Sequence, residues 1–354
     1  MKASIIGTGW VTPLGRDVEE VWQAIQKGAK PETSTPMGSR QWPVWPVPPA
    51  MVAAEQALPR LRRSSIISHF AVAAARDAVA MAGLSPEELS RCALIFATSD
   101  GGVVYTRRFY ADIVKSGPAT GSPLLFPETV YNAPASHVAA SLGLAGEVLT
   151  LVGDGTAGLA AVHVAGELLA GDTLDHCLVV TSQELDWIST EAYGRWHLIH
   201  GAADAAAVPF AEGAAALVLS RRSGPVQVSF SHAGFSYSTC REARTRMSSM
   251  LAAAPAAIQP ELIVSSDGGG NFHQIEREIC AEFYPEAGVL KPKYSLGEAL
   301  AVSTLQQVIV ANRVLQEKPG RHALIPAIGF NGQLGALILT GGGAGSQDSP
   351  LSSP

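Results

Sequence analysis

The chain has 354 residues, of which 47% are hydrophobic and 16% charged, and its formal net charge is −6. This length suggests two fused halves or one large α/β unit, and an acidic balance without Lys/Arg-rich runs argues against nucleic acid as a main partner. Because no run of about 18 apolar residues occurs and the chain opens on a strand-like run instead of a signal peptide, we expect a cytoplasmic protein with no membrane partner.

Strand-like apolar runs alternate with helical patterns along the first half of the chain. Near its start, Gly7-Thr8-Gly9 does not fit a dinucleotide-binding fingerprint, because the third glycine is missing and Pro13 lies where the helix would begin. The elements expected in chain order are a strand at 3–7, helices over 17–25 and 64–82, strands at 93–98 and 148–152, a helix over 156–170, and strands at 177–181 and 212–219.

The second half repeats this alternation. It is expected to contain strands at 226–230, 261–266, 323–327 and 336–340, with a helix over 300–315. Alternating elements with apolar strands predict an α/β fold whose sheets are covered on both faces. We expect an N-terminal half over 1–221, a C-terminal half over 222–343, and a small, polar, disordered tail over 344–354.

The cysteines and the closest histidine pair give no sign of a metal site. Cys92, Cys177, Cys240 and Cys280 show no C-x-x-C spacing, so neither zinc nor a disulfide framework is expected. Cys92 and Cys177 adjoin strand-like runs and are expected to be buried, whereas Cys240 follows a polar run and is kept as a less favoured candidate nucleophile. His197 and His200 have i, i+3 spacing but no evident third ligand.

A strand, a Gly-rich turn and a small-residue helix follow one another over residues 146–161. This arrangement holds a nucleophile at a helix N-terminus, where free N–H groups and the helix dipole favour negative charge. Asp154 is expected to cap the helix, and Thr156 is a less favoured hydroxyl nucleophile, since it does not lie at the apex of the turn.

This turn and six other landmarks, in the same order, resemble β-ketoacyl synthases of the thiolase superfamily. The landmarks are residues 12–15, 82–84, 132–136, 153–158, 212–215, 293–297 and 329–332. The resemblance extends from Ser4 to Leu339 and implies the duplicated thiolase-like fold, in five layers α/β/α/β/α. It also implies acyl carrier protein and acyl thioesters as partners, no cofactor, and a dimer formed through the strand that follows the elbow helix, here 178–182.

The family condenses thioesters with one cysteine and two histidines, and the resemblance places other residues at all three positions. The cysteine position falls on Gly155, the first histidine on Asp267, and the second, at the end of the run that contains Lys293 and Gly297, on Glu298. A glycine cannot form a thioester, and an ionised carboxylate donates no hydrogen bond to a malonyl carbonyl. The condensing reaction is therefore not expected.

Two interpretations of the carboxylates remain open. Asp267 and Glu298, converging on one pocket, would repel each other, and one could hold a shared proton as a new acid/base pair. The favoured interpretation is that both carboxylates arose by sequence drift after catalysis was no longer required. His273 could also enter the site, although a surface or helix-start histidine is preferred.

One functional loop is retained. Gly329-Phe330-Asn331-Gly332 resembles the family's Gly-Phe-Gly-Gly loop, in which the phenylalanine N–H forms half of an oxyanion hole. The other half would come from the N–H of Gly155, so the expected pocket comprises Gly155, Thr156, Gly329, Phe330 and Asn331. The stretch before Glu212 is shorter than the family norm, which puts the acyl-tunnel gate in doubt.

The function expected from these features is that of a non-condensing, chain-length-factor-like subunit, which shapes an acyl pocket together with an active ketosynthase partner. Two alternatives stay open. One is an enzyme with altered chemistry that uses Asp267 and Glu298 on an acyl thioester, and the other is a homodimer that binds acyl groups or acyl carrier protein.

Overall fold

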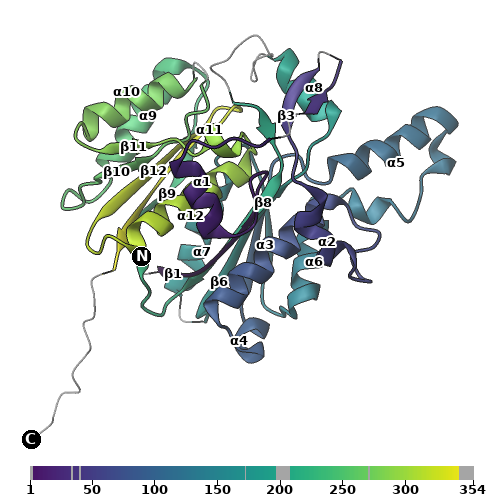
Figure 1. Cartoon of the computed structure of the whole chain (residues 1–354), viewed down its shortest axis with the longest axis horizontal. Coiled ribbons are helices and arrows are strands. Elements are labelled where there is room, and N and C mark those ends of the chain that lie inside the picture. The colour runs from purple at the N-terminus through teal and green to yellow at the C-terminus, as the bar shows by residue number, and fades with distance from the viewer. Residues whose placement is uncertain are drawn as a thin grey trace, which may run out of the picture.

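The structure is a computed structural model that describes residues 3–32, 35–39, 41–171, 173–196, 208–269 and 272–342. Its framework is a ten-stranded mixed sheet, shown in Figure 1. The first half of the chain supplies β1 (Ala3–Val11), β4 (Ala93–Thr98), β5 (Val148–Val152), β6 (His176–Gln183) and β8 (Gly213–Ser220). The second half supplies β9 (Val226–Ser236), β10 (Leu262–Val264), β11 (Gly288–Leu290), β12 (His322–Ile328) and β13 (Gln333–Gly341).

The two halves order their strands identically. From the centre outward the order is β1-β8-β6-β4-β5 in one half and β9-β13-β12-β10-β11 in the other. In both, two antiparallel pairings are followed by two parallel ones. The halves join where β1 pairs with β9, from Ala3↔Val228 to Ile5↔Val226. This repeat confirms the prediction of a duplicated α/β fold.

Helices cover both faces of each half, which gives five layers. On the outside of the first half, α3 (Ile66–Ala82) packs on β1, β6 and β8, and α6 (Ala133–Leu142) packs on α3 and β4. In the middle, α7 (Ala157–Ala170) and α12 (Ala301–Gln316) contact strands of both halves. On the far side, α9 (Cys240–Ala252) and α10 (Phe272–Phe283) cover β13 and β12 (Figure 1).

The remaining described elements lie around this core. They are α1 (Val18–Gln26), α2 (Ala53–Gln56), α4 (Pro86–Ser90), α5 (Val103–Ser116), α8 (Trp187–Arg195), α11 (Lys293–Leu296), 3₁₀ turns at Pro49–Val52, Pro118–Thr120 and Phe126–Glu128, and a small sheet of β2 (Thr35–Met37), β3 (Trp42–Trp45) and β7 (Phe210–Ala211). In the part of the chain that the structure describes, no helix has the length and apolar character needed to cross a bilayer.

Glycines bring helices close to their neighbours at two places. A Cβ at Gly7 or Gly9 would collide with backbone carbonyls of α3, so these glycines of β1 serve helix–sheet packing. This agrees with the rejection of a dinucleotide-binding motif. In the central layer, a Cβ at Gly158 would lie 2.5 Å from Oγ1 of Thr304, so Gly158 lets α7 approach α12.

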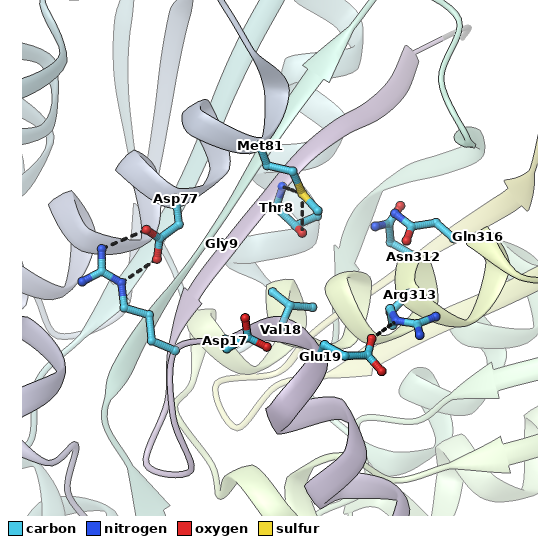
Figure 2. Close-up of a pocket in the computed structure, with 11 residues that line it drawn as sticks. Thr8, Gly9, Asp17, Val18, Glu19, Asp77, Met81, Asn312, Arg313 and Gln316 are labelled. Atoms are coloured by element: carbon cyan, nitrogen blue, oxygen red, sulfur yellow. Dashed lines mark hydrogen bonds and ion pairs between the residues drawn. The ribbon is translucent and has the colours of Figure 1, made fainter.

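A cavity of about 530 Å³ lies beside β1, between α1, α3 and the end of α12 (Figure 2). Ion pairs cross its rim, from Arg16 to Asp77 and from Arg313 to Glu19. None of the residues that line it belongs to the predicted site. Size alone therefore does not identify the functional pocket of this fold.

The strand that we expected at a subunit interface lies in the interior of the sheet. Residues 178–182 belong to β6, which pairs with β4 on one side and β8 on the other and is buried throughout. That expectation is wrong, because β6 has no free edge. The edge strand of this half is β5, the strand that precedes the elbow, and its Val148 and Val152 are 42% and 53% exposed.

Candidate functional site

The elbow forms where β5 ends and α7 begins, as predicted. The N-cap residue of α7 is Thr156, not Asp154, and its side chain makes no capping bond. Asp154 instead stabilises the turn from two residues earlier, since its Oδ1 accepts hydrogen bonds from the N–H (2.9 Å) and the hydroxyl (2.9 Å) of Thr156. Thr156 remains the less favoured candidate nucleophile because it lies one residue past the apex of the turn, although its hydroxyl donates to a carboxylate.

The Asp154 carboxylate also joins the elbow to the glycine-rich loop at 329–332. Its Oδ2 accepts the N–H of Asn331 at 3.1 Å, and a Cβ on Gly329 would collide with the carboxyl group. Burial raises the pKa of Asp154, although hydrogen bonds from Thr156 and Asn331 oppose this shift. The structure therefore brings together two segments that the resemblance placed at one site.

Gly155 lies at the apex of the turn with open space where a side chain would be. A Cβ there would meet nothing closer than the carbonyl oxygen of Leu300, at 3.8 Å, and Gly155 is not among the glycines with positive φ. In the described chain the N–H groups of Gly155 and Phe330 have no hydrogen-bond acceptor. Both groups remain free, and their joint action as an oxyanion hole stays a prediction.

Asp267 is fully buried and is held by two cations. Its Oδ2 accepts hydrogen bonds from Arg277 and Lys291, both at 2.8 Å, and its Oδ1 accepts the N–H of Gly269 at 2.9 Å. Burial alone would raise the pKa of Asp267, but these hydrogen bonds, above all that of Lys291, lower it to about 2. Asp267 is therefore an ionised, paired carboxylate.

Glu298 has a different cation. Its Oε2 lies 2.5 Å from Nζ of Lys293, with both side chains buried, and its Oε1 accepts the N–H of Leu300 at 2.8 Å. Leu300, with φ of +52°, adopts a backbone conformation that is strained for a residue other than glycine. The short stretch before Glu212 lies alongside Glu298, since the N–H of Ala211 donates to its carbonyl oxygen at 2.9 Å.

The expected repulsion between Asp267 and Glu298 is not what the structure shows. Each carboxylate is neutralised by its own cations, and within the described chain no hydrogen bond joins the two. A proton shared between them has no physical basis, because neither carboxylate faces the other unpaired. Lys293, which was expected as a supporting residue, forms the ion pair with Glu298. Gly297, with φ of +82°, ends the helical turn before Glu298.

Several residues around Asp267 were not predicted. Arg277 lies ten residues further along in α10, and Lys291 follows β11, so no local spacing in the sequence links them to Asp267. His273, at the start of α10, is buried instead of exposed, with Nδ1 3.8 Å from Oδ1 of Asp267. Burial, followed by the charge of Lys293, lowers the pKa of His273 to about 3, so the imidazole is neutral.

The cysteines follow the expected division. Cys92 and Cys177 are buried, and Cys240 is the exposed first residue of α9. Tyr237, just before that helix, donates its hydroxyl to the carbonyl oxygen of Gly329 at 3.2 Å. His197 and His200 lie outside the described residues, and among the residues that are described no cluster of metal ligands occurs.

A cavity of about 480 Å³ adjoins the elbow. Gly153 and Thr156 contribute to its wall from the turn, Ala160 and Val164 from α7, and Phe235 from β9. The exposed strand β5 also lines it, so the cavity reaches from the candidate site to the free edge of the sheet.

Comparisons with known proteins also point to β-ketoacyl synthases. The family described as "Beta-ketoacyl synthase, N-terminal domain" matches residues 2–224. The chain is 28% identical over 188 residues to the 3-oxoacyl-[acyl-carrier-protein] synthase 2 of Coxiella burnetii, a match that covers 49% of this chain and 44% of that protein. The chain thus spans less than half the length of this curated relative in the match.

Solved structures with low sequence identity share the fold. The ishigamide ketosynthase/chain length factor has a TM-score of 0.82 at 18% identity, covering 97% of this chain and 100% of the other. A type II polyketide acyl-carrier protein in complex with its ketosynthase (TM-score 0.80, 15% identity, 96% and 99% covered) and a β-ketoacyl synthase from Burkholderia phymatum (0.80, 17%, 96% and 99%) are also similar. The chain belongs to the β-ketoacyl synthase family, and its fold is the duplicated thiolase-like fold.

Proposed function

We propose that this chain is a non-condensing, chain-length-factor-like member of its family, which shapes an acyl pocket together with an active ketosynthase subunit. The observation that carries the proposal is the glycine at the apex of an otherwise complete elbow. Gly155 offers no nucleophile, and Asp267 and Glu298 are held in ion pairs in place of the two histidines. Ionised carboxylates of this kind cannot donate hydrogen bonds to a developing enolate.

The pocket itself supports the acyl-shaping role. The cavity beside the elbow runs along α7 to the open edge at β5, where apolar side chains remain exposed. Two of the similar solved structures are described as a ketosynthase/chain length factor and as a ketosynthase with its acyl carrier protein. By analogy, the partner would be a ketosynthase and the ligand an acyl chain delivered by a carrier protein.

Mass spectrometry tests the absence of condensation. The purified chain, alone and with a co-expressed ketosynthase, is incubated with acyl and malonyl carrier thioesters, and its intact mass is measured. We expect no acyl adduct on this chain and one adduct on the partner. A stoichiometric adduct on this chain, mapped to Thr156, Cys240 or another residue, would overturn the proposal in favour of an acyl-processing enzyme.

A substitution in α7 tests the pocket-shaping role. Ala160 lines the cavity, so Ala160→Phe should shorten the acyl product made by the assembled complex, while Ala170→Phe, at the exposed far end of the same helix, should leave it unchanged. The measurement is the product-length distribution by mass spectrometry. An unchanged distribution in a complex that contains Ala160→Phe would favour a homodimer that only binds acyl groups or carrier protein.

A further inference from the structure

A second amphipathic cavity, of about 270 Å³, lies on the outer side of the second half between α10, β10 and β11. It shares no lining residue with the cavity beside the elbow. Its wall is formed by Ile263, Ser265, Glu276, Arg277, Cys280, Ala281, Tyr284, Pro285, Ala287, Val289 and Lys291. Figure 1 shows these three elements together at one end of the molecule.

The body of this cavity is apolar. Ile263, Cys280 and Tyr284 are buried around it, and Ala287 and Val289 extend the apolar wall. Burial raises the pKa of the Cys280 thiol, so the thiol stays neutral and adds no charge. Hydrocarbon is the group that gains most from such a wall.

Two cations stand at its polar end. Arg277 and Lys291 have side chains that are 44% and 38% exposed, and both donate to one oxygen, Oδ2 of Asp267. One carboxylate therefore serves two cations, and the other N–H groups of both side chains are available for a further anion.

Two acidic residues of α10 close to these cations already have partners within the protein. Glu276 is fully buried, its carboxyl group accepts hydrogen bonds from Ser265 and Ser266, and burial raises its pKa. Glu278, on the exposed side of α10, is paired with Arg244. Both of these carboxyl groups are therefore engaged by other groups of the protein, and the cations that face the cavity are Arg277 and Lys291.

We propose that this cavity binds a small monocarboxylate with a short apolar chain, whose carboxylate bridges Arg277 and Lys291 while its chain occupies the space along Tyr284 and Val289. The volume lies below the roughly 300–1,000 Å³ of sites for drug-sized ligands, which suits a short chain. A carboxylate between two cations accepts charge-assisted hydrogen bonds from both.

The same two cations connect this cavity to the candidate site. Asp267 occupies a family catalytic position, and a bound carboxylate would compete with it for Arg277 and Lys291. Removal of the Asp267 charge should therefore tighten ligand binding, whereas removal of a cation should weaken it. Both effects are expected if the ligand and Asp267 share the two cations.

Calorimetric titration of the full chain with hexanoate tests the proposal. Lys291→Met should weaken hexanoate binding by about tenfold or more, as expected for the loss of one charge-assisted hydrogen bond. Ala281→Phe, which fills the wall without altering charge, should abolish it, and Asp267→Asn should tighten it several-fold. Lys318→Met removes an exposed cation that does not line the cavity and is the matched control.

Two reference ligands separate the contributions of chain and charge. Hexan-1-ol keeps the chain without the charge, acetate keeps the charge without the chain, and both should bind much more weakly than hexanoate. Acetate binding as tightly as hexanoate would overturn the proposal, because it would indicate a plain surface anion site. No hexanoate binding, or binding unaffected by both Lys291→Met and Ala281→Phe, would overturn it as well.

Discussion

Buried carboxylates with different surroundings respond differently to the same substitution. Glu298→Gln would leave Lys293 buried without a counter-charge, and the expected cost is about 3–5 kcal/mol of unfolding free energy. Gln retains an oxygen for the N–H of Leu300, so the loss comes mainly from the ion pair. Chemical denaturation measures it, and the double variant Glu298→Gln with Lys293→Met should recover most of the lost stability.

Asp267→Asn is the matched comparison, with an expected cost of about 1–3 kcal/mol, because Arg277 and Lys291 are half-exposed and keep their hydration. The pKa of Asp267 is lowered from 3.8 to about 2, so its contribution to stability is complete above pH 3.8 and is lost as the pH falls through about 2. The difference between wild type and Asp267→Asn should shrink in acid. A difference that grows in acid, or a Glu298→Gln variant as stable as wild type, would contradict these ion pairs.

The open space at Gly155 allows a cysteine to be placed at the apex of the elbow, where we propose that a nucleophile is absent. Gly155→Cys should fold normally, since its Cβ would meet only Leu300, and the helix N-terminus should lower the pKa of the new thiol. In a Cys240→Ser background, an acyl thioester should give one adduct, detected by intact mass, while Cys240→Ser alone gives none. Failure of the elbow cysteine to acylate would mean that the turn has lost its reactive geometry. Condensation itself should stay absent in either case.

Sequence reasoning located Asp267 and Glu298 but not what surrounds them. The two positions could be assigned from the sequence because glycines near them resemble the family pattern. Arg277 and Lys291, in contrast, reach Asp267 from an adjacent helix and from the end of a strand. Such pairings depend on tertiary packing, so the sequence suggested repulsion where the structure has ion pairs. Lys293 was visible, since it lies five residues before Glu298 in a recognisable run.

At the scale of single elements, the exposed strand β5 bears on how the chain assembles with a partner. It pairs with β4 on one side, and its other edge is unpaired in this chain. Exposed apolar side chains on the same half, Tyr110, Val114, Leu124, Phe126, Val148, Leu149 and Val152, would be covered by a partner. An uncovered apolar edge strand is prone to pair with another chain.

Charged residues on this strand should prevent assembly. The double variant Val148→Lys and Val152→Lys places two lysines on exposed positions and should shift a micromolar dimer to monomer, measured by multi-angle light scattering with or without a ketosynthase partner. Val289→Lys is the matched control, because it lies on β11, the edge strand of the other half, and is 54% exposed. If Val289→Lys alone dissolves the dimer, the interface lies at the opposite edge.

The type of each element was predicted more accurately than which elements lie next to it in the fold. The helix expected over 64–82 is α3, and the expected strands correspond to β1, β4, β5, β6 and β8 in the first half. The error was the placement of β6 at an edge. Local periodicity shows that a segment is a buried strand, but it does not show which strands flank it, since these pairings join residues far apart in the sequence.

At the scale of the whole molecule, the central helices hold the two halves together. Gly158→Val would place side-chain atoms against Thr304 and Ala301 and force α7 away from α12. We expect a loss of about 3 kcal/mol or more, and a single unfolding transition for both halves, because α7 and α12 pack against both. Calorimetry measures both quantities. Separate transitions in which only the first half is weakened would mean that the halves are energetically independent.

The shared central layer also bears on how a chain of this kind can be divided. One hydrophobic cluster contains residues from β1 and α7 of the first half and from α12 and β12 of the second. A gene split near 221–225, between β8 and β9, would produce two polypeptides, each with one face of its sheet and one helix uncovered. Each fragment would depend on prompt encounter with the other to escape aggregation. Because the two halves share this buried layer, breaking their covalent linkage should be costly.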